Sequence, residues 1–139
     1  MQTTMITSAS QWDKDRWPNF SPSEFVCKGD GTLMMHPDFL DRLQKLRTEF
    51  GAPLKIMSGY RSPSYNSKVS FTGEDGPHTT GRAVDILINR ASAVKVLKIA
   101  LDLGFTGIGV AQKGADGSRF LHLDDLSAPD HPRPGIWSY

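Results

Sequence analysis

Residues 76–86 of the chain read GPHTTGRAVDI, a turn that leads into an apolar, β-branched run. This run predicts a strand over 82–88. Asp85 interrupts the strand, and an unpaired carboxylate is costly to bury among apolar neighbours. It therefore needs a cation or several hydrogen bonds. Gly81 lets the chain turn sharply between Asp85 and His78, which lies seven positions earlier.

The flanking segments predict an α+β domain. Before the strand, apolar residues recur at three- and four-residue spacings up to a glycine cap at Gly51, which indicates a helix. After it, Val94, Leu97, Ile99 and Leu103 form the apolar face of a second helix. Because one helix alone lies between strands and a hairpin-like turn follows, the order favours a central, mostly antiparallel sheet flanked by helices. The expected elements are helices over 37–50 and 92–103, strands over 53–60, 82–88, 106–112 and 118–126, a long loop over 61–81 and an irregular tail over 127–139.

Composition limits the classes of protein that fit. The chain has 139 residues, 38% hydrophobic and 22% charged, so we expect a single domain over 17–139 after a loose polar arm over 1–16. A formal net charge of +1 argues against general attraction to nucleic acid or to an anionic membrane. Cys27 is the only cysteine, which excludes an internal disulfide and a multi-thiolate zinc site. A monomer is the default expectation.

The chain shows no targeting or membrane segment. No run approaches the roughly 18 apolar residues of a membrane span. The start, MQTTMITSASQWDKDRW, lacks the basic and apolar regions of an export signal. We therefore expect no membrane insertion and a protein that is made in the cytoplasm.

The stretch RFLHLDD, residues 119–125, brings a second imidazole and carboxylate together. Strand alternation places its leucines on one face, toward the core, and Phe120, His122 and Asp124 on the other. Same-face neighbours on a strand lie about 7 Å apart. A metal held by His122 would therefore have Asp124 in its outer shell, near a bound water.

Together, His78, Asp85 and His122 offer two imidazoles and one carboxylate, with a fourth position left for water. This is the ligand set of a catalytic zinc site, where zinc polarises a carbonyl and lowers the pKa of its water to about 7. The alternative is a structural domain in which the three side chains form hydrogen bonds only. His36, at a helix start, and His131, in the tail, are second choices as ligands.

A further element is SGYRSPSYN, residues 58–66. Arg61 follows a strand in a turn rich in hydroxyl and amide side chains, and its planar fork matches a carboxylate of a peptide. The alternative is a loop arginine that pairs with a neighbouring Asp or Glu.

In this order, SGYRSPSYN, HTTGRAVDI and FLHLD resemble the zinc D-Ala-D-Ala carboxypeptidase group of peptidoglycan peptidases, which shares its core with hedgehog signalling domains and lysostaphin-type endopeptidases. FSPSEFVCKGDG and RPGIWSY also resemble the short bacterial and phage members. The resemblance covers about residues 17–139. It implies an α+β fold with a central antiparallel sheet, and hydrolysis of an amide in the cell-wall stem peptide or its crosslink. By position it implies zinc on His78, Asp85 and His122, substrate contact or transition-state support by Arg61, a wall shaped by Ser58, Tyr60 and Asn66, and a cleft lined by Trp137 and Tyr139.

Two positions depart from the family pattern. The family commonly has Ser two places before the motif histidine, where this chain has Gly76. Better-known relatives have Glu or Asp, as general base, three places before the strand histidine, where this chain has Arg119. Asp124 is the preferred replacement and Asp116 the second, although Asp124 could instead orient a ligand.

These observations predict a zinc-dependent peptidoglycan peptidase, with Arg61 and Asp124 as catalytic residues. The missing carboxylate at Arg119 supports an alternative, a catalytically inactive, metal-containing module that binds the cell wall. The family resemblance further suggests a phage lysis protein that reaches the wall after release or on a virion. The bond that is cut stays open between the D-Ala–D-Ala, L-Ala–D-Glu and diaminopimelate linkages.

Overall fold

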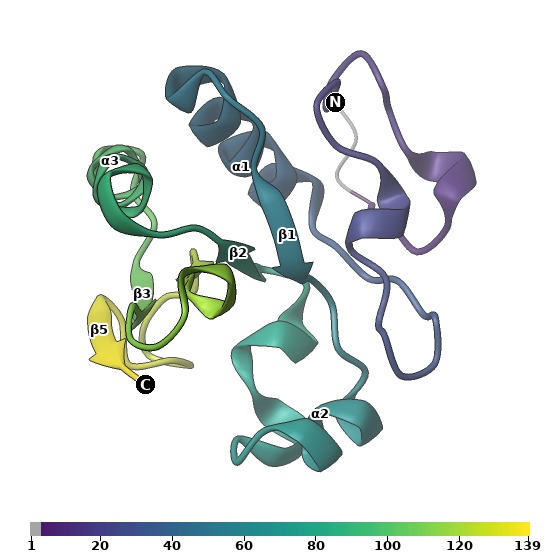
Figure 1. Ribbon diagram of the computed structural model, residues 1–139. Helices are drawn as coiled ribbons and strands as arrows, with labels where there is room; N and C mark the ends of the chain where they lie inside the picture. Colours follow the sequence, from purple (N-terminus) through teal and green to yellow (C-terminus); the bar gives the residue numbers. More distant parts are fainter. Residues whose placement is uncertain (1–3) are drawn as a thin grey trace.

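The computed structural model describes residues 4–139, which fold around a five-stranded sheet (Figure 1). The strand order is β1-β2-β4-β3-β5. Three of its four pairings are antiparallel, and β3 and β5 pair in parallel. The predicted α+β class is therefore confirmed, and the sheet is mixed and mostly antiparallel, as expected. The strands are β1 (Lys55–Ser58), β2 (Ala83–Leu87), β3 (Gly107–Ala111), β4 (Phe120–Asp124) and β5 (Gly135–Ser138).

Two long helices form where the apolar spacing predicts them. Helix α1 (Pro37–Phe50) begins with proline and ends at Gly51, which takes a left-handed conformation with a φ of 76°. Helix α3 (Arg90–Asp102) packs against α1 and β4. The predicted face of α3 is wrong at Val94, which is 69% exposed. The face that is buried instead carries the small residues Ala93 and Ala100 with Val96, because small side chains let a helix pack closely on its neighbours.

The two faces of the sheet carry different kinds of side chain. In β4, Leu121 and Leu123 are buried in the hydrophobic core, as alternation predicted. His122 and Asp124 lie on the opposite face of the same strand. The sheet thus uses one face for the core and gives the other to polar, chemically active side chains.

Two regions expected to be irregular contain regular structure. The predicted loop over 61–81 holds helix α2 (Pro63–Val69), which lies past the end of β1 in Figure 1. The Ser62 side chain caps α2 by accepting a hydrogen bond from the Tyr65 backbone N–H. The predicted irregular tail contains β5, whose hydrogen-bond partners come from β3, far away in the sequence. Neither element has a strong periodicity of its own, because α2 is short and β5 depends on its neighbour.

The described part of the expected loose arm packs on the domain. Ile6 is fully buried and forms a β-bridge with Met35. The Trp12 indole donates a hydrogen bond to the backbone carbonyl of Phe20, and its ring stacks near that of Phe25. Ile6 and Trp12 therefore anchor this segment on the domain, whereas residues 7–10 and 13–15 are exposed. No helix among residues 4–139 has both the length and the apolar character needed to cross a membrane.

Candidate metal centre

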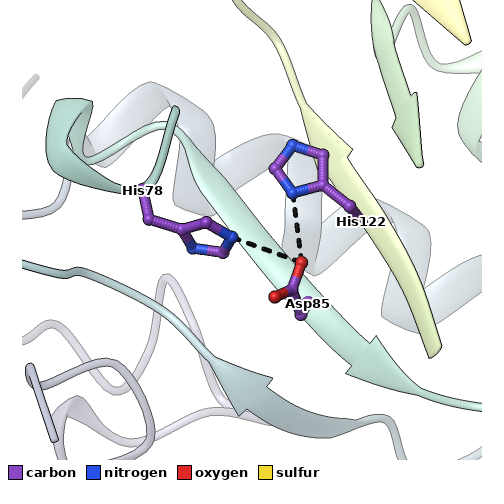
Figure 2. A group of neighbouring side chains, drawn as sticks. All are labelled: His78, Asp85 and His122. Atoms are coloured by element: carbon purple, nitrogen blue, oxygen red, sulfur yellow. Dashed lines mark hydrogen bonds and ion pairs between the residues drawn. The ribbon is translucent and has the colours of Figure 1, made fainter. Parts of the chain in front are cut away.

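Three elements bring His78, Asp85 and His122 together (Figure 2). Asp85 lies in β2 and His122 in β4, and the two residues are direct partners across the antiparallel pair. His78 lies in a short 3-10 turn, Pro77–Thr80, that precedes β2. Gly81 ends this turn with a φ of 77°, and a β-carbon there would lie 2.6 Å from the backbone carbonyl oxygen of Met34. Glycine is therefore required at the reversal that returns the chain to Asp85.

The donor atoms have the spacing of a zinc site. One carboxylate oxygen of Asp85, Oδ1, lies 3.3 Å from Nε2 of His78 and 3.1 Å from Nδ1 of His122. One ligand atom from each residue falls in a group that spans at most 4.8 Å. Tetrahedral ligands about 2.0–2.1 Å from zinc lie roughly 3.3 Å from one another. The two imidazoles and the carboxylate thus fit zinc in both chemistry and spacing.

Each imidazole is oriented by an acceptor at its other nitrogen. Nδ1 of His78 lies 2.8 Å from the backbone carbonyl of Gly59, and Nε2 of His122 lies 2.8 Å from Oδ2 of Asp124. A histidine ligand typically donates its second N–H to such an acceptor, which leaves the metal-facing nitrogen free of a proton. The three residues are each at most 5% exposed, so the cluster is buried.

The electrostatics of the cluster suit a cation. Burial by itself raises the pKa of Asp85, but the charge of His78 and the hydrogen bond from His122 hold that pKa well below its usual range. Burial lowers the pKa of His122, yet its hydrogen bonds to Asp124 and Asp85 outweigh burial and raise it. In the absence of a metal, a proton on His122 therefore helps to compensate the buried carboxylates beside it.

Two glycines in β3 make room for the centre. Gly107 pairs with Asp124 and Gly109 with His122 in the register of β3 and β4. A β-carbon on Gly107 would collide with the Asp124 carboxylate, and one on Gly109 would lie 2.9 Å from Cβ of His122. The sequence GIG at the start of β3 therefore allows the polar side chains of β4 to lie flat on the sheet.

Comparison with known proteins agrees with this geometry. A family model described as Peptidase M15 matches residues 18–124, which include all three clustered side chains. The chain belongs to the peptidase M15 family. The proteins named peptidoglycan L,D-endopeptidase MepK from Escherichia coli K12 and from Shigella flexneri are each 29% identical to it over 94 residues. That match covers 63% of this chain and 50% of each relative, so the chain spans about half the length of the curated relatives it matches.

A cavity of about 620 Å³ opens onto the M15 centre. His78, Asp85 and His122 line it together with three residues expected at the site, Arg61, Trp137 and Tyr139. The cavity is also lined by side chains that the sequence did not point to. These are Val69 at the end of α2, Phe71 and Thr72 after it, Asp75 and Phe120, and His131 to Arg133 of the tail.

Arg61 is held beside the centre by two contacts. Its Nη1 donates a hydrogen bond to Oδ1 of Asn66 at 3.2 Å, and its Nη2 lies 3.6 Å from Oδ2 of Asp85. The guanidinium therefore lines the cavity and also faces Asp85, and its contact with a substrate stays a prediction.

Three residues predicted to shape the wall do not line the cavity. Ser58 lies in β1 as a partner of Asp85 in the sheet. Tyr60 is buried in the hydrophobic core, and Asn66 is 1% exposed beneath the segment that follows α2. Asn66 donates hydrogen bonds to Thr72 and Gly73, so it supports the wall from behind. The motif spacing identified a segment beside the cavity but not which of its side chains line it.

The two carboxylates considered as general base lie away from the cavity. Asp116 pairs with Arg90 at 3.0 Å and with Arg119 at 3.4 Å in an exposed turn. Asp124 is 0% exposed and lies at Nε2 of His122, the ring nitrogen on the side away from Asp85. Its position is that of a residue that orients His122, the second of the two roles considered for it.

One of the cavity-lining residues that were not predicted has a feature visible in the sequence. Phe71 is a lone aromatic residue in a polar, glycine-rich stretch, and it is 97% exposed. A large apolar side chain that the fold leaves in solvent is informative, because it often marks a binding surface. Asp75 and His131 carry no such signal, because their place on the cavity depends on how two loops fold back over the sheet.

Proposed function

We propose that the chain is a zinc-dependent peptidoglycan peptidase that hydrolyses an amide bond of the cell-wall peptide. The observation that carries this proposal is the convergence of His78, Asp85 and His122 at zinc-ligand spacing on the floor of a cavity. Membership of the peptidase M15 family supports the reaction type. The similarity to proteins named peptidoglycan L,D-endopeptidase supports the substrate.

The three clustered residues would hold the zinc. When bound there, zinc supplies a Lewis acid for the scissile carbonyl and a water of lowered pKa. Asp124 keeps the Nε2–H of His122 hydrogen-bonded, so that Nδ1 stays available as a ligand. Arg61 presents its guanidinium to a carboxylate or a developing negative charge of the substrate peptide.

Proton transfer falls to a group that faces the cavity. Among the described residues that line it, Asp75 and His131 carry a carboxylate and an imidazole, the side-chain types that serve as general bases. Single Asp75→Asn and His131→Gln variants identify the base. The variant in which the general base has been replaced is expected to keep zinc, and its kcat is expected to fall about 10²–10⁴-fold. If neither variant loses turnover, both residues are removed from this role.

The walls of the cavity suit an extended peptide with apolar parts. Val69 and Phe71 stand on one side, 51% and 97% exposed, and Trp137 and Tyr139 of the C-terminal segment also line the cavity. We infer that these four side chains contact apolar parts of the peptide beside the scissile bond, while Arg61 binds an anionic group. The apolar area of Phe71 is then covered by substrate rather than by water.

Incubation of purified protein with zinc and peptidoglycan tests the function. New free amino groups that depend on zinc are expected, and mass spectrometry of the released muropeptides identifies the bond. A crosslink between an L- and a D-centre is the first candidate, and the D-Ala–D-Ala and L-Ala–D-Glu bonds are the others. Binding to peptidoglycan without new amino groups would favour the inactive binding module, and a zinc stoichiometry near zero after dialysis would favour a purely structural cluster.

We also propose delivery of the phage type, in which the protein acts on the wall after release from the cytoplasm. Expression in a bacterium, with and without a separate membrane-permeabilising protein, tests this. Lysis is expected only when both are present. Lysis by the peptidase alone would contradict it.

A further inference from the structure

Arg133 is a tail residue that reaches the metal centre. It lies between β4 and β5, and its side chain is 8% exposed. Its Nε and Nη2 each donate a hydrogen bond to Asp124, to Oδ1 and Oδ2 respectively, both at 2.9 Å. This two-pronged geometry holds a carboxylate in one plane, which a single contact does not do.

The donors around Asp124 decide what His122 can do. Besides the two from Arg133, the backbone N–H of Leu126 points to Oδ1 at 3.3 Å, and Nε2 of His122 lies 2.8 Å from Oδ2. An ionised carboxylate only accepts hydrogen bonds, so His122 must supply the proton from Nε2. Nδ1 faces the Asp85 carboxylate at 3.1 Å, which competes for the proton of a neutral ring. The shorter contact of 2.8 Å to Asp124 favours the Nε2–H form, which leaves the lone pair on Nδ1.

Arg133 also contacts the ring system from a second direction. Its guanidinium lies 5.0 Å from the centroid of the Trp137 ring, and that ring lies 5.1 Å from the ring of His122. Asp124 and Trp137 are therefore both held by Arg133, and both contact the same imidazole.

We propose that Arg133 is a positioning residue for the metal centre. It holds Asp124 in the plane where the carboxylate accepts the Nε2 proton of His122, and so keeps Nδ1 available to the ion. This inference rests on the proposed function, because it assumes that His122 is a ligand. Its consequence is that the C-terminal segment is part of the metal centre and not merely a cover over it.

Two substitutions test the proposal, Arg133→Met and Arg133→Lys. Met removes both donors, and Lys keeps the charge but not the fork. Zinc affinity, measured by competition with a chromophoric chelator, is expected to fall about 10–100-fold in the Met variant and by a smaller factor in the Lys variant. In the metal-free protein, at a pH where the ring is neutral, ¹⁵N-detected NMR is expected to show the Nε2–H form of His122 in the wild type and a mixture of forms in the variants.

A matched control separates positioning from general stability. Arg16 makes the same two-pronged contact with Asp41, at 2.7 Å through Nε and 2.7 Å through Nη2, away from the cavity. Arg16→Met is expected to lower the melting temperature and to leave zinc affinity and the His122 signals unchanged. If Arg133→Met does not fold, Arg133→Lys is judged by the same two readouts.

Unchanged zinc affinity together with an unchanged Nε2–H signal in a folded Arg133 variant would overturn the proposal. Failure of the proposed function is distinguishable. It would appear as absent zinc binding or absent hydrolysis in the wild type, whereas the NMR readout on the metal-free protein reports on Arg133 alone.

Discussion

His122 works through both of its ring nitrogens, which makes it the most sensitive single residue of the site. One nitrogen faces Asp85 at 3.1 Å and the other faces Asp124 at 2.8 Å. Substitution therefore removes a proposed zinc ligand and leaves the buried Asp124 carboxylate without the donor at Nε2.

His122→Ala is expected to abolish both zinc binding and hydrolysis, because two ligands hold zinc much more weakly than three. Metal analysis after dialysis and release of amino groups from peptidoglycan measure the two losses. His36→Ala is the control, because His36 lies at the start of α1 outside the clustered ligands. Retention of stoichiometric zinc by His122→Ala would contradict the assignment.

Arg61→Lys keeps a positive charge near Asp85 but loses the planar fork. We expect zinc to be retained and kcat/KM on a defined muropeptide to fall about tenfold, as for one lost charge-assisted hydrogen bond. Unchanged kinetics would remove Arg61 from substrate recognition.

Phe71→Ala tests the substrate wall without disturbing the fold. Because the side chain is 97% exposed, the melting temperature is expected to stay the same. If the substrate covers this ring, about 1.5–3 kcal/mol of apolar burial is lost, and KM rises roughly tenfold or more. Leu101→Ala, at a 57% exposed position on α3, is the control and should leave KM unchanged.

At the scale of elements, the glycines of β3 are explained by the side chains that they adjoin in the metal centre. Gly107 and Gly109 face Asp124 and His122 across the pairing with β4. A larger residue at position 107 would push the Asp124 carboxylate away from Arg133 and from His122. Glycine has a low β-propensity, but at these positions it leaves space for the side chains of the metal centre.

Gly107→Ala is expected to destabilise the protein by about 1–3 kcal/mol through overpacking, and also to weaken zinc binding. Denaturant unfolding and chelator competition measure the two effects. Gly117→Ala is the matched control, because a β-carbon at Gly117 would meet nothing within 4 Å. Equal zinc affinity in the Gly107 and Gly117 variants would contradict this view of β3.

At the scale of the whole molecule, the buried ionisable groups make stability depend on pH and on zinc. In the metal-free protein, burial lowers the pKa of His122, but its hydrogen bonds to Asp124 and Asp85 raise it overall. The contribution of His122 to the free energy of unfolding is therefore complete below about pH 6.5 and is lost as pH rises through the folded-state pKa. For Asp124, burial acts to raise the pKa, but hydrogen bonds from His122 and Arg133 lower it to about 2. The contribution of Asp124 is therefore present above about 3.9 and is lost as pH falls toward 2.

The metal-free protein is thus expected to melt at the highest temperature between about pH 4 and 6.5. Zinc must displace the Nδ1 proton of His122, so the increase in melting temperature caused by zinc should grow as pH rises above 6.5. Thermal melts with and without zinc across this range measure both trends. A metal-free melting temperature that rises steadily through pH 7 would contradict the role given to His122.

Much of the fold was predictable from short-range patterns. The spacing of apolar residues in 37–50 predicted α1, and the alternation in 120–124 predicted which side chains of β4 face the core. Such patterns are reliable because they follow from the period of a single element. On α3, Leu97, Ile99 and Leu103 pack against the core as predicted, but Val94 is exposed, because apolar size alone favoured it over the small alanines that pack.

The sequence by itself determined the family, the α+β class, and the histidines and aspartate that form the cluster, because these are properties of local motifs and their order. Only the tertiary structure decided that β5 pairs with β3, that Arg133 reaches Asp124, and that Phe71 rather than Tyr60 lines the cavity. The physical reason is that these contacts join segments with weak periodicity of their own. Their partners are selected by burial, hydrogen bonding and available space in the folded molecule, and none of these quantities is a property of a local stretch of sequence.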